Sequence, residues 1–463
     1  MTTGHQRTDG ASGPLTGTAH RRLDHVVLVD ETLREGDARG YHTHTPEARA
    51  GLIKLIHEVG GINEFSLGMA VVNGNEFATL QHALEARRRG LLPASIRFHV
   101  YGWFQIHDRC QQVLAQLSAE ERSCIAFDMA ISASDTLTRS QDVPWLRAHG
   151  WLSRDEELLS AGRLLEARAS AYTDVMRPYQ ELGLAGVGIL LQDGFRSTET
   201  ELDACIAAGI AGGGEGVRLH DTVGIATPPL VIRRLEHLGA VFPETQVHVH
   251  FHDDFGMATA NTITGLMAGA GGADVTVNGV GNRAGNASTQ EVLMGLKVMC
   301  ETVLPGVQYG RLTELARAVE QHYALAQSPH APVTGRLVHL DESSIRTHLL
   351  HTAGDTTWAP YDPRDVGATL EAAHSATSGQ YAIELTLQRA KAALAADGVS
   401  IDPELVARAY SWMTSERELR AGHFRPLALS ALETYQQALR SSYVTDAELV
   451  GVAVATKGTF DRT

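Results

Sequence analysis

The sequence contains no apolar run long enough to cross a membrane. Residues 1–22 are polar and rich in glycine and threonine, and they include no apolar core of the kind found in signal peptides. We therefore expect a disordered N-terminal tail at residues 1–22, no membrane anchor, and a cytoplasmic protein.

Cysteine is scarce, because the 463 residues include only four, scattered along the chain with no C-x-x-C pair. This spacing argues against a zinc ribbon or a disulfide framework and predicts reduced thiols in the cytosol. Positive charge is also in deficit, since 39 lysines and arginines stand against 54 aspartates and glutamates, for a formal net charge of -15. We therefore expect no nucleic acid and no anionic membrane as partner.

What the sequence does contain is a regular alternation of short apolar segments and amphipathic helices from about residue 25 to 305. The predicted strands are 24–29, 62–67, 96–101, 124–131, 186–191, 216–219, 247–252 and 274–278, and predicted helices include 46–59, 155–182, 198–211 and 228–238. Eight strand–helix units are typical of a closed parallel barrel, whereas an open doubly wound sheet usually has fewer. The predicted fold is therefore α/β, a (β/α)8 TIM barrel followed by a linker and a small, mainly helical C-terminal region.

The stretch from Val247 to Asp254 alternates apolar residues with three histidines and ends in two acids. Side chains two apart on a strand share a face, so His250 and His252 point together from the C-terminal end of that strand. His248 shares the face but lies deeper, where we expect a role in the core or behind the ligands. A carboxylate commonly completes such an imidazole pair in a metal site with open positions. The candidates are the acids that follow the first strand, within residues 30–37.

The C-terminal ends of the strands are where TIM barrels place their chemistry. Nearly every predicted strand ends there in side chains able to bind a ligand or transfer a proton: Arg34, Glu35, Glu64, His99, Ser132, Ser134, Gln192, Asp193, Arg196, His220, Asp221, Thr222, His250, His252, Asn278, Asn282, Arg283 and Asn286.

Four ordered motifs among these residues point to a known family. Leu33-Arg34-Glu35-Gly36, Asp221-Thr222-Val223-Gly224, His250 to Gly256 and Gly281 to Ala287 resemble, in order and spacing, the signatures of homocitrate synthases and 2-isopropylmalate synthases. The resemblance covers residues 25–305 strongly and 335–385 weakly. It implies a metal-dependent, Claisen-type condensation in which acetyl-CoA, as co-substrate, adds through its methyl carbon to the carbonyl of a 2-oxo acid. Hydrolysis of the thioester then releases CoA.

The resemblance also implies roles for individual residues. Glu35, His250 and His252 match the family's ligands to one divalent metal ion, with Asn286 nearby, and zinc, magnesium, manganese or cobalt would suit such a site. Arg34 is implied as a catalytic cation beside the developing negative charge. Thr222 matches a hydroxyl donor to the substrate carboxylate. Arg196 falls in a stretch similar to the family's E-D-x-x-R-S/T pattern and is expected to shape the substrate pocket, as is His99.

Two departures from the family pattern lie near the implied metal. Ala38 stands where the family has glutamine, with Arg39 after it, and Asn282 replaces a glutamate. Both changes make the pocket more positive, if Arg39 faces the site and not solvent. We therefore expect a 2-oxo acid that carries an additional anionic group, such as a phosphonate or a second carboxylate, with Arg39 and Asn282 among its binding residues.

The segment after the barrel departs further from the family. Residues 341–348 resemble its H-E-S-G-I-H stretch, whose last histidine helps take the proton from acetyl-CoA with the assistance of a tyrosine, but Arg346 and Trp358 occupy these two positions. Arginine stays protonated at neutral pH and makes a poor base. His348 is our candidate base, because it shares a face with Arg346 if the segment is extended. The alternative candidates are Glu64, His99 and His339.

Domain boundaries follow from these patterns. We expect a catalytic barrel at 23–305, a linker or lid at 306–378, and a helical subdomain at 379–463 that includes helices at 382–395 and 403–410. The family's linker exchange implies a homodimer.

Two other functions stay open: an aldolase or lyase on the same barrel that uses the metal and Arg34 without CoA, and a non-catalytic protein that binds metal and ligand.

Overall fold

The computed structural model describes residues 23, 25–37, 44–69, 74–153, 159–341, 359–374, 378–441 and 446–455. The predicted tail at 1–22 lies outside these residues, as do Arg39, Arg346, His348 and Trp358.

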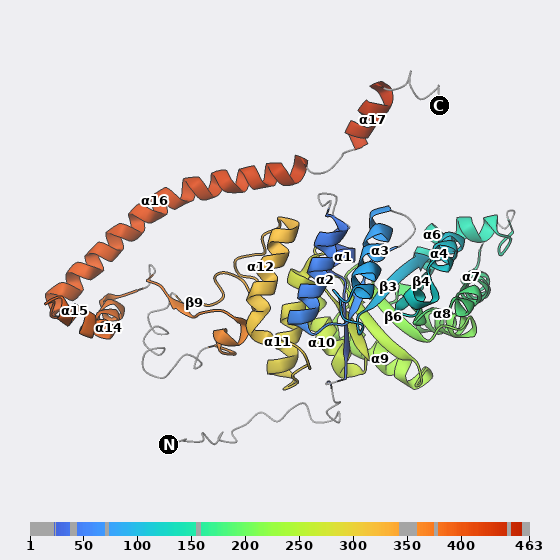
Figure 1. The fold of residues 1–463 in the computed structure, drawn as a ribbon, viewed down its shortest axis with the longest axis horizontal. Coiled ribbons are helices and arrows are strands. Elements are labelled where there is room, and N and C mark those ends of the chain that lie inside the picture. The colour runs from blue at the N-terminus through green and yellow to red at the C-terminus, as the bar shows by residue number, and fades with distance from the viewer. Residues whose placement is uncertain are drawn as a thin grey trace.

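Eight parallel strands close into a barrel in sequence order (Figure 1). They are β1 (Val27–Asp30), β2 (Glu64–Ser66), β3 (Arg97–Trp103), β4 (Ile125–Ser132), β5 (Gly186–Gln192), β6 (Gly216–Asp221), β7 (Gln246–Phe251) and β8 (Gly272–Val275). The barrel closes where β1 pairs with β8, with Leu28 opposite Ala273. The predicted (β/α)8 barrel is therefore confirmed.

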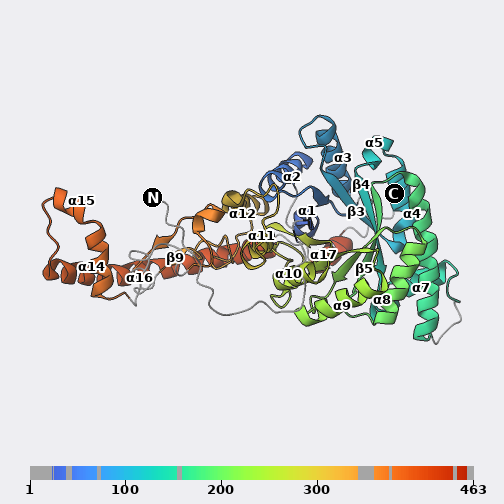
Figure 2. The same ribbon diagram turned by 90° about the horizontal axis from the view of Figure 1, so that it is seen from below.

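The helices surround the barrel and follow its strands (Figures 1 and 2). They are α1 (Thr32–Asp37), α2 (Pro46–Gly60), α3 (Gly74–Arg88), α4 (His107–Ala115), α5 (Ala119–Arg122), α6 (Asp135–Ala148), α7 (Ala161–Met176), α8 (Glu199–Ala211), α9 (Pro228–Val241), α10 (Ala258–Ala268) and α11 (Thr289–Met299).

Helix α2 shows how local sequence sets these boundaries. The Thr45 hydroxyl accepts a hydrogen bond from the Ala48 N–H, and Pro46 occupies the first turn, where no intrahelical donor is needed. The helix ends at Gly61, whose φ of 65° is the left-handed conformation that glycine adopts without strain. Leu52 and Ile56 are buried on the face that packs against the strands.

Three boundaries differ from the predicted ones for local reasons. The helix predicted over 155–182 is α7 followed by a 3-10 segment, Arg177–Leu182, because Pro178 at its start cannot continue the α-helical hydrogen bonds. The strand predicted over 274–278 ends at Val275 and gives way to a 3-10 turn, Val277–Gly279. The strand predicted over 247–252 ends at Phe251, one residue before His252. His252 instead pairs with Asn286 in an isolated bridge.

After the barrel, α12 (Leu312–Tyr323) packs against α2, and two short strands, β9 (Leu340–Asp341) and β10 (Glu371–Ala372), pair with each other. The helices α14 (Gln380–Arg389), α15 (Lys391–Ala396), α16 (Pro403–Ser441) and α17 (Asp446–Ala455) follow. The predicted helix 382–395 is thus two helices that meet at Ala390, and the helix predicted over 403–410 continues to Ser441. Helix α16 begins beside α15, far from the barrel, and runs back toward the barrel side of the molecule (Figures 1 and 2). Among the described residues, no helix combines the length and the apolar character that a membrane crossing requires.

Candidate metal centre

Helix α1 begins immediately after β1 and brings Arg34 and Glu35 to the mouth of the barrel. Asp30, the last residue of β1, accepts hydrogen bonds from the Thr32 N–H at 3.1 Å and from the Thr32 hydroxyl at 2.7 Å. The Thr32 hydroxyl oxygen also accepts a hydrogen bond from the Val277 N–H at 2.9 Å. These contacts tie the start of α1 to the segment that follows β8.

Tyr323 on α12 holds the same helix from the other side. Its hydroxyl donates to the Thr32 carbonyl at 2.9 Å and lies 3.2 Å from an oxygen of Asp37. The fit is close, because a Cβ atom on Gly36 would lie 2.7 Å from the tyrosine ring. Glycine at position 36 therefore allows α1 to pack directly on Tyr323.

The buried carboxyl of Asp30 gives a testable pH dependence of stability. Burial raises its pKa from 3.8 to about 7, although the two hydrogen bonds from Thr32 oppose the rise. The folded protein thus holds this proton more tightly than the unfolded chain does. The resulting stability is complete below pH ~4 and is lost as the pH rises to ~7. At roughly 1.4 kcal/mol for each tenfold change in proton affinity, the loss is about 4 kcal/mol.

Urea unfolding at pH 5 and pH 8 measures the part of this loss that occurs above pH 5, about 3 kcal/mol. We expect the free energy of unfolding of the wild type to fall more between the two pH values than that of Asp30→Asn, which has no proton to lose at this position. All other titrating groups are common to both proteins and cancel in the comparison. Equal pH dependence of the two proteins would show that Asp30 is not the group responsible.

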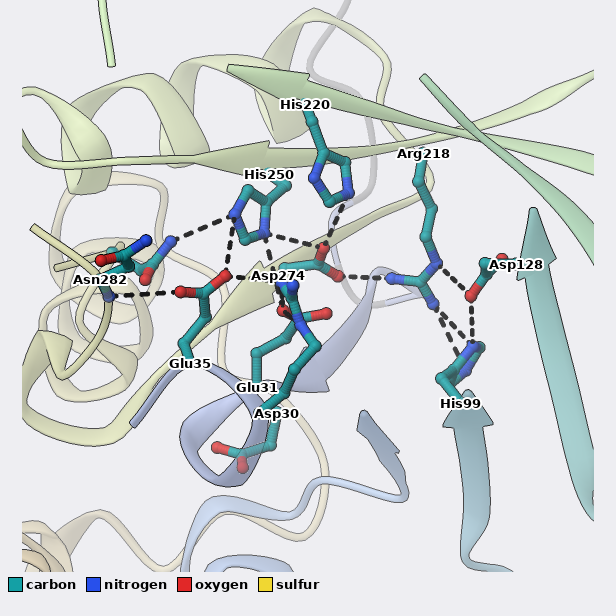
Figure 3. Close-up of polar contacts among 12 residues, drawn as sticks. Asp30, Glu31, Glu35, His99, Asp128, Arg218, His220, His250, Asp274 and Asn282 are labelled. Atoms are coloured by element: carbon teal, nitrogen blue, oxygen red, sulfur yellow. Dashed lines mark hydrogen bonds and ion pairs between the residues drawn. The ribbon is translucent and has the colours of Figure 1, made fainter. Parts of the chain in front are cut away.

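Glu35 and His250 face each other at the mouth of the barrel (Figure 3), and His252 completes the group. One potential ligand atom from each lies within 4.8 Å of the other two, and all three residues are buried. The Nε2 atom of His250 is 3.9 Å from Oε1 of Glu35. Two imidazoles and a carboxylate at this spacing match the donor set of a divalent cation with open coordination positions.

The ionisation states in this group suit a cation. Burial alone would raise the pKa of Glu35, but the positive charge of Arg34, followed by His250 and His252, lowers it to about 2. Burial, reinforced by His250, lowers the pKa of His252 to about 3. The site therefore offers a carboxylate and a neutral imidazole at neutral pH, which are the forms that bind metals.

Asn286 completes this side of the site. Its Nδ2 lies 3.2 Å from Nε2 of His250 and 3.4 Å from Nδ1 of His252. Its Oδ1 is buried without a hydrogen-bond partner among the described residues. A buried amide oxygen beside two imidazoles and a carboxylate fits a cation that would take it as a further ligand. The residues present thus fit a divalent metal ion, and the assignment of Glu35, His250, His252 and Asn286 as its ligands stays a prediction.

The other nitrogen of His250 is held from behind. Its Nδ1 lies 3.1 Å from Oδ2 of Asp274 on β8, so the ring donates there and keeps the lone pair of Nε2 directed toward Glu35. His220 stacks on His250, with ring centroids 4.1 Å apart. His220, His250 and Asp274 form a second cluster of potential ligands, but it shares His250 with the first.

Arg34 lies beside the carboxylate of the proposed ligand group. Its guanidinium is 2.8 Å from Oε1 of Glu35, bonds to Glu31, and rests over the ring of Tyr101 with 5.3 Å to the centroid. A fixed positive charge thus lies next to the place where a substrate oxygen would approach the cation. Sequence reasoning named Arg34 and Glu35, but it assigned no role to Glu31 or Tyr101.

His99 lies apart from Glu35, in a charged layer inside the barrel with Asp128, Arg218 and Asp274 (Figure 3), and Glu64 contacts His99. His99 Nε2 is 2.9 Å from Glu64, and His99 Nδ1 is 3.2 Å from Asp128. Glu64 also lines a cavity of about 720 Å³ together with Leu304 and Gly306. The candidate base Glu64 is linked to His250 through His99, Arg218 and Asp274.

Asp128, Arg218 and Asp274 were not predicted as site residues. Each is a charged residue with apolar neighbours in a barrel strand, and all three are buried. That pattern is the signal that could have identified them, since a buried charge requires a partner.

The remaining predicted residues surround the mouth of the barrel. Thr222 accepts a hydrogen bond from the Asp193 N–H at 2.7 Å, and Arg196 donates to the Asp193 carboxylate at 2.7 Å. The side chain of Arg196 is 36% exposed, so it can still reach a ligand. The Asn282 N–H donates to Oε2 of Glu35 at 3.3 Å, which ties the segment after β8 to the proposed ligand.

Comparison with known proteins identifies the family. The HMGL-like family model matches residues 156–319. The 2-isopropylmalate synthase of Sulfolobus acidocaldarius is 34% identical over 363 residues, covering 78% of this chain and 85% of that protein. Homocitrate synthase AksA of Methanopyrus kandleri is 28% identical, and the match covers 79% of this chain and 83% of that protein. A probable 2-isopropylmalate synthase of the same organism is 29% identical over 370 residues. The match covers 79% of this chain and 66% of that protein.

Among solved structures, hydroxymethylglutaryl-CoA lyase of Pseudomonas aeruginosa shares the fold, with a TM-score of 0.51 and 17% identity over 68% of this chain and 98% of the lyase. The ordered motifs, the closed barrel and the identity to the Sulfolobus protein agree. The chain belongs to the family of 2-isopropylmalate synthases and homocitrate synthases.

Proposed function

We propose that the protein is a metal-dependent acyltransferase that condenses acetyl-CoA with a 2-oxo acid. The observation that carries this proposal is the buried group of Glu35, His250 and His252 with Arg34 beside it. In the proposed reaction, the methyl carbon of acetyl-CoA loses a proton and forms a bond to the carbonyl carbon of the oxo acid. The carbonyl oxygen takes up a proton, and water then cleaves the thioester, which yields CoA and a 2-hydroxy acid with two carboxylates, as in a 2-alkylmalate, or three, as in homocitrate.

The chain's own residues supply the environment for this step. Glu35, His250 and His252, with Asn286, would hold a divalent ion, which polarises the 2-oxo carbonyl and stabilises negative charge on its oxygen. Arg34 is anchored by Glu31 and Glu35, so its charge is in place before the reaction and requires no reorganisation. The Thr222 hydroxyl accepts from Asp193 and retains its own proton for the substrate carboxylate. His348 is our candidate for the base that takes the methyl proton.

We further propose that the acceptor carries a second anionic group, either a carboxylate or a phosphonate. Support comes from Asn282, which places an uncharged amide where the family has a carboxylate and contacts Glu35 only through its backbone. Arg196 is 36% exposed and bonds to Asp193, which also bonds to Thr222, so it could meet such a group, and Arg39 would add a second cation. A neutral branched or methyl side chain on the acceptor would contradict this part of the proposal.

Release of free thiol from acetyl-CoA tests the proposed reaction. The metal-loaded full chain is assayed with acetyl-CoA and, in turn, pyruvate, 2-oxoisovalerate, 2-oxoglutarate and phosphonopyruvate. We expect thiol release only when both substrates are present, fastest with one of the two dianionic acceptors, and lost after treatment with a chelator. Carbonyl products formed without CoA would favour a lyase, and binding of oxo acid without turnover would favour a ligand-binding protein.

We also propose a homodimer in which the linker of each subunit reaches the barrel of the other. Helix α16 supports association, because Trp412, Phe424 and Leu427 on it are 64%, 70% and 70% exposed. Mixing the two variants Glu35→Gln and His348→Ala tests the exchange. If His348 acts across the interface, co-refolded mixtures should recover activity that neither variant has alone. No recovery in a confirmed mixed dimer would place His348 and Glu35 in the same subunit's site or exclude His348 as the base.

The four free thiols agree with a cytoplasmic enzyme.

A further inference from the structure

Arg218 on β6 lies inside the barrel and contacts three other strands. Its Nε is 2.9 Å from Asp128 on β4, its NH1 is 2.6 Å from Asp274 on β8, and its NH2 is 2.9 Å from Nδ1 of His99 on β3. In the tautomer of His99 that donates from Nε2 to Glu64, Nδ1 accepts this last hydrogen bond. Every guanidinium nitrogen of Arg218 then has an acceptor. The side chain is 7% exposed and is held in one orientation.

Asp274 is the contact of Arg218 that matters for the metal centre. One carboxylate oxygen, Oδ1, binds Arg218, and the other, Oδ2, lies 3.1 Å from Nδ1 of His250. Both oxygens are thus occupied, and the side chain is 2% exposed. Arg218 fixes the plane of the carboxylate, and the carboxylate fixes the ring of His250 (Figure 3).

A second imidazole competes for the same oxygen. The Nε2 of His220 is 3.9 Å from Oδ2 of Asp274 and has no hydrogen-bond partner among the described residues. A carboxylate released from Arg218 could turn toward His220 and satisfy that buried nitrogen. His250 would then lose the acceptor that keeps its proton on Nδ1 and its Nε2 lone pair free for a cation.

We propose that Arg218 is a positioning residue of the metal centre: by holding Asp274 it selects His250 over His220 and sets the orientation and tautomer of the His250 ligand. The proposal rests on the proposed metal site. It adds that the strength of metal binding depends on an arginine that contacts neither the cation nor the substrate.

Metal affinity of the full-length apoprotein tests this role without any assay of activity. Zinc and manganese are titrated in competition with a fluorescent chelator into the wild type, Arg218→Met, Arg218→Lys, Asp274→Asn and the double variant of Arg218→Met with Asp274→Asn. Loss of a partner behind a metal-ligating histidine typically weakens metal binding by roughly 10- to 100-fold. We expect about 10-fold weaker binding for Arg218→Met and a smaller effect for Arg218→Lys, which keeps the charge but not the three contacts.

The double variant separates action through Asp274 from an independent effect. If Arg218 acts through Asp274, the double variant should bind metal as Asp274→Asn alone does, because the second change removes nothing further. The absorption spectrum of bound cobalt should shift in the same way in Arg218→Met and Asp274→Asn, which reports a changed His250 ligand.

Arg168→Met provides a matched control. Arg168 is also a buried arginine, with a 2.6 Å hydrogen bond to Thr138, but it lies on α7 outside the barrel. Its loss should lower stability without changing metal affinity. Thermal unfolding identifies any variant that does not fold, and Arg218→Lys, the more conservative change, then decides the question. Wild-type affinity in folded Arg218 variants, or effects that multiply in the double variant, would overturn the proposal. A wild-type chain that binds no metal would overturn the metal site itself, and this proposal with it.

Discussion

Glu35→Gln should release thiol from acetyl-CoA about 1,000-fold more slowly than the wild type, or not at all, since a bound metal supplies several kcal/mol and each 1.4 kcal/mol is about a tenfold change in rate. The substitution keeps the shape of the side chain but removes the only carboxylate of the proposed ligand group. Its charge is fully developed at neutral pH, because Arg34 and the two histidines hold the pKa of Glu35 at about 2 against the effect of burial. Rates of thiol release and metal content measured on the same preparation check this expectation.

Glu58→Gln is the matched control for Glu35→Gln. Glu58 lies on the surface of α2, 3.9 Å from Lys54, with its side chain 43% exposed. The same chemical change at this position should leave both metal content and rate unchanged. A Glu35→Gln protein that retains its metal and its rate would remove Glu35 from the ligand set and would weaken the whole assignment.

Arg34→Met should lower kcat by roughly 100- to 1,000-fold, the range seen when one fixed donor to a developing oxyanion is removed. The expected signature differs from that of Glu35→Gln, because Arg34 is not a ligand. Metal should remain bound, since loss of the guanidinium frees Oε1 of Glu35 from its 2.8 Å ion pair. Steady-state kinetics with separate kcat and KM values, together with metal content, measure this difference.

Arg34→Lys is the informative companion variant. Lysine retains the positive charge, but a single ammonium group cannot span Glu31 and Glu35 as the planar guanidinium does. Its kcat should lie between those of the wild type and Arg34→Met. Full activity in Arg34→Met would show that the positive charge at this position does not stabilise the transition state.

The fold could be predicted from the sequence because it depends on local patterns, and the same patterns indicated which candidate ligands lie close together. Alternation of apolar strands and amphipathic helices predicted the barrel, and the two-residue spacing of His250 and His252 placed both imidazoles on one side. The predicted continuous strand is not what positions His252, because β7 ends at Phe251. The bridge to Asn286 holds His252 instead.

The charged layer could not be predicted in the same way, because it depends on which strands become neighbours and at what register. Arg218 contacts residues that are 56 and 119 positions away in the sequence, Asp274 and His99. A lone arginine or aspartate in an apolar strand indicates that a buried partner exists, but it does not say which one. The proposed base and the predicted contact of Arg39 fall outside the described residues, and there the sequence alone carries the prediction.

The contacts of the Tyr323 hydroxyl with α1 have a consequence for the order in which the nascent chain folds. The hydroxyl bonds to Thr32 and Asp37 at the two ends of α1, almost 300 residues earlier in the chain, with separations of 291 and 286 positions. During synthesis on the ribosome, helix α1 with Arg34 and Glu35 therefore gains its contacts with Tyr323 only after about 70% of the 463 residues have emerged. All eight barrel strands precede Tyr323 in the sequence. A nascent chain can therefore complete its barrel before the contacts of Tyr323 with α1 form. Metal binding that depends on these contacts would then follow barrel formation as a separate step.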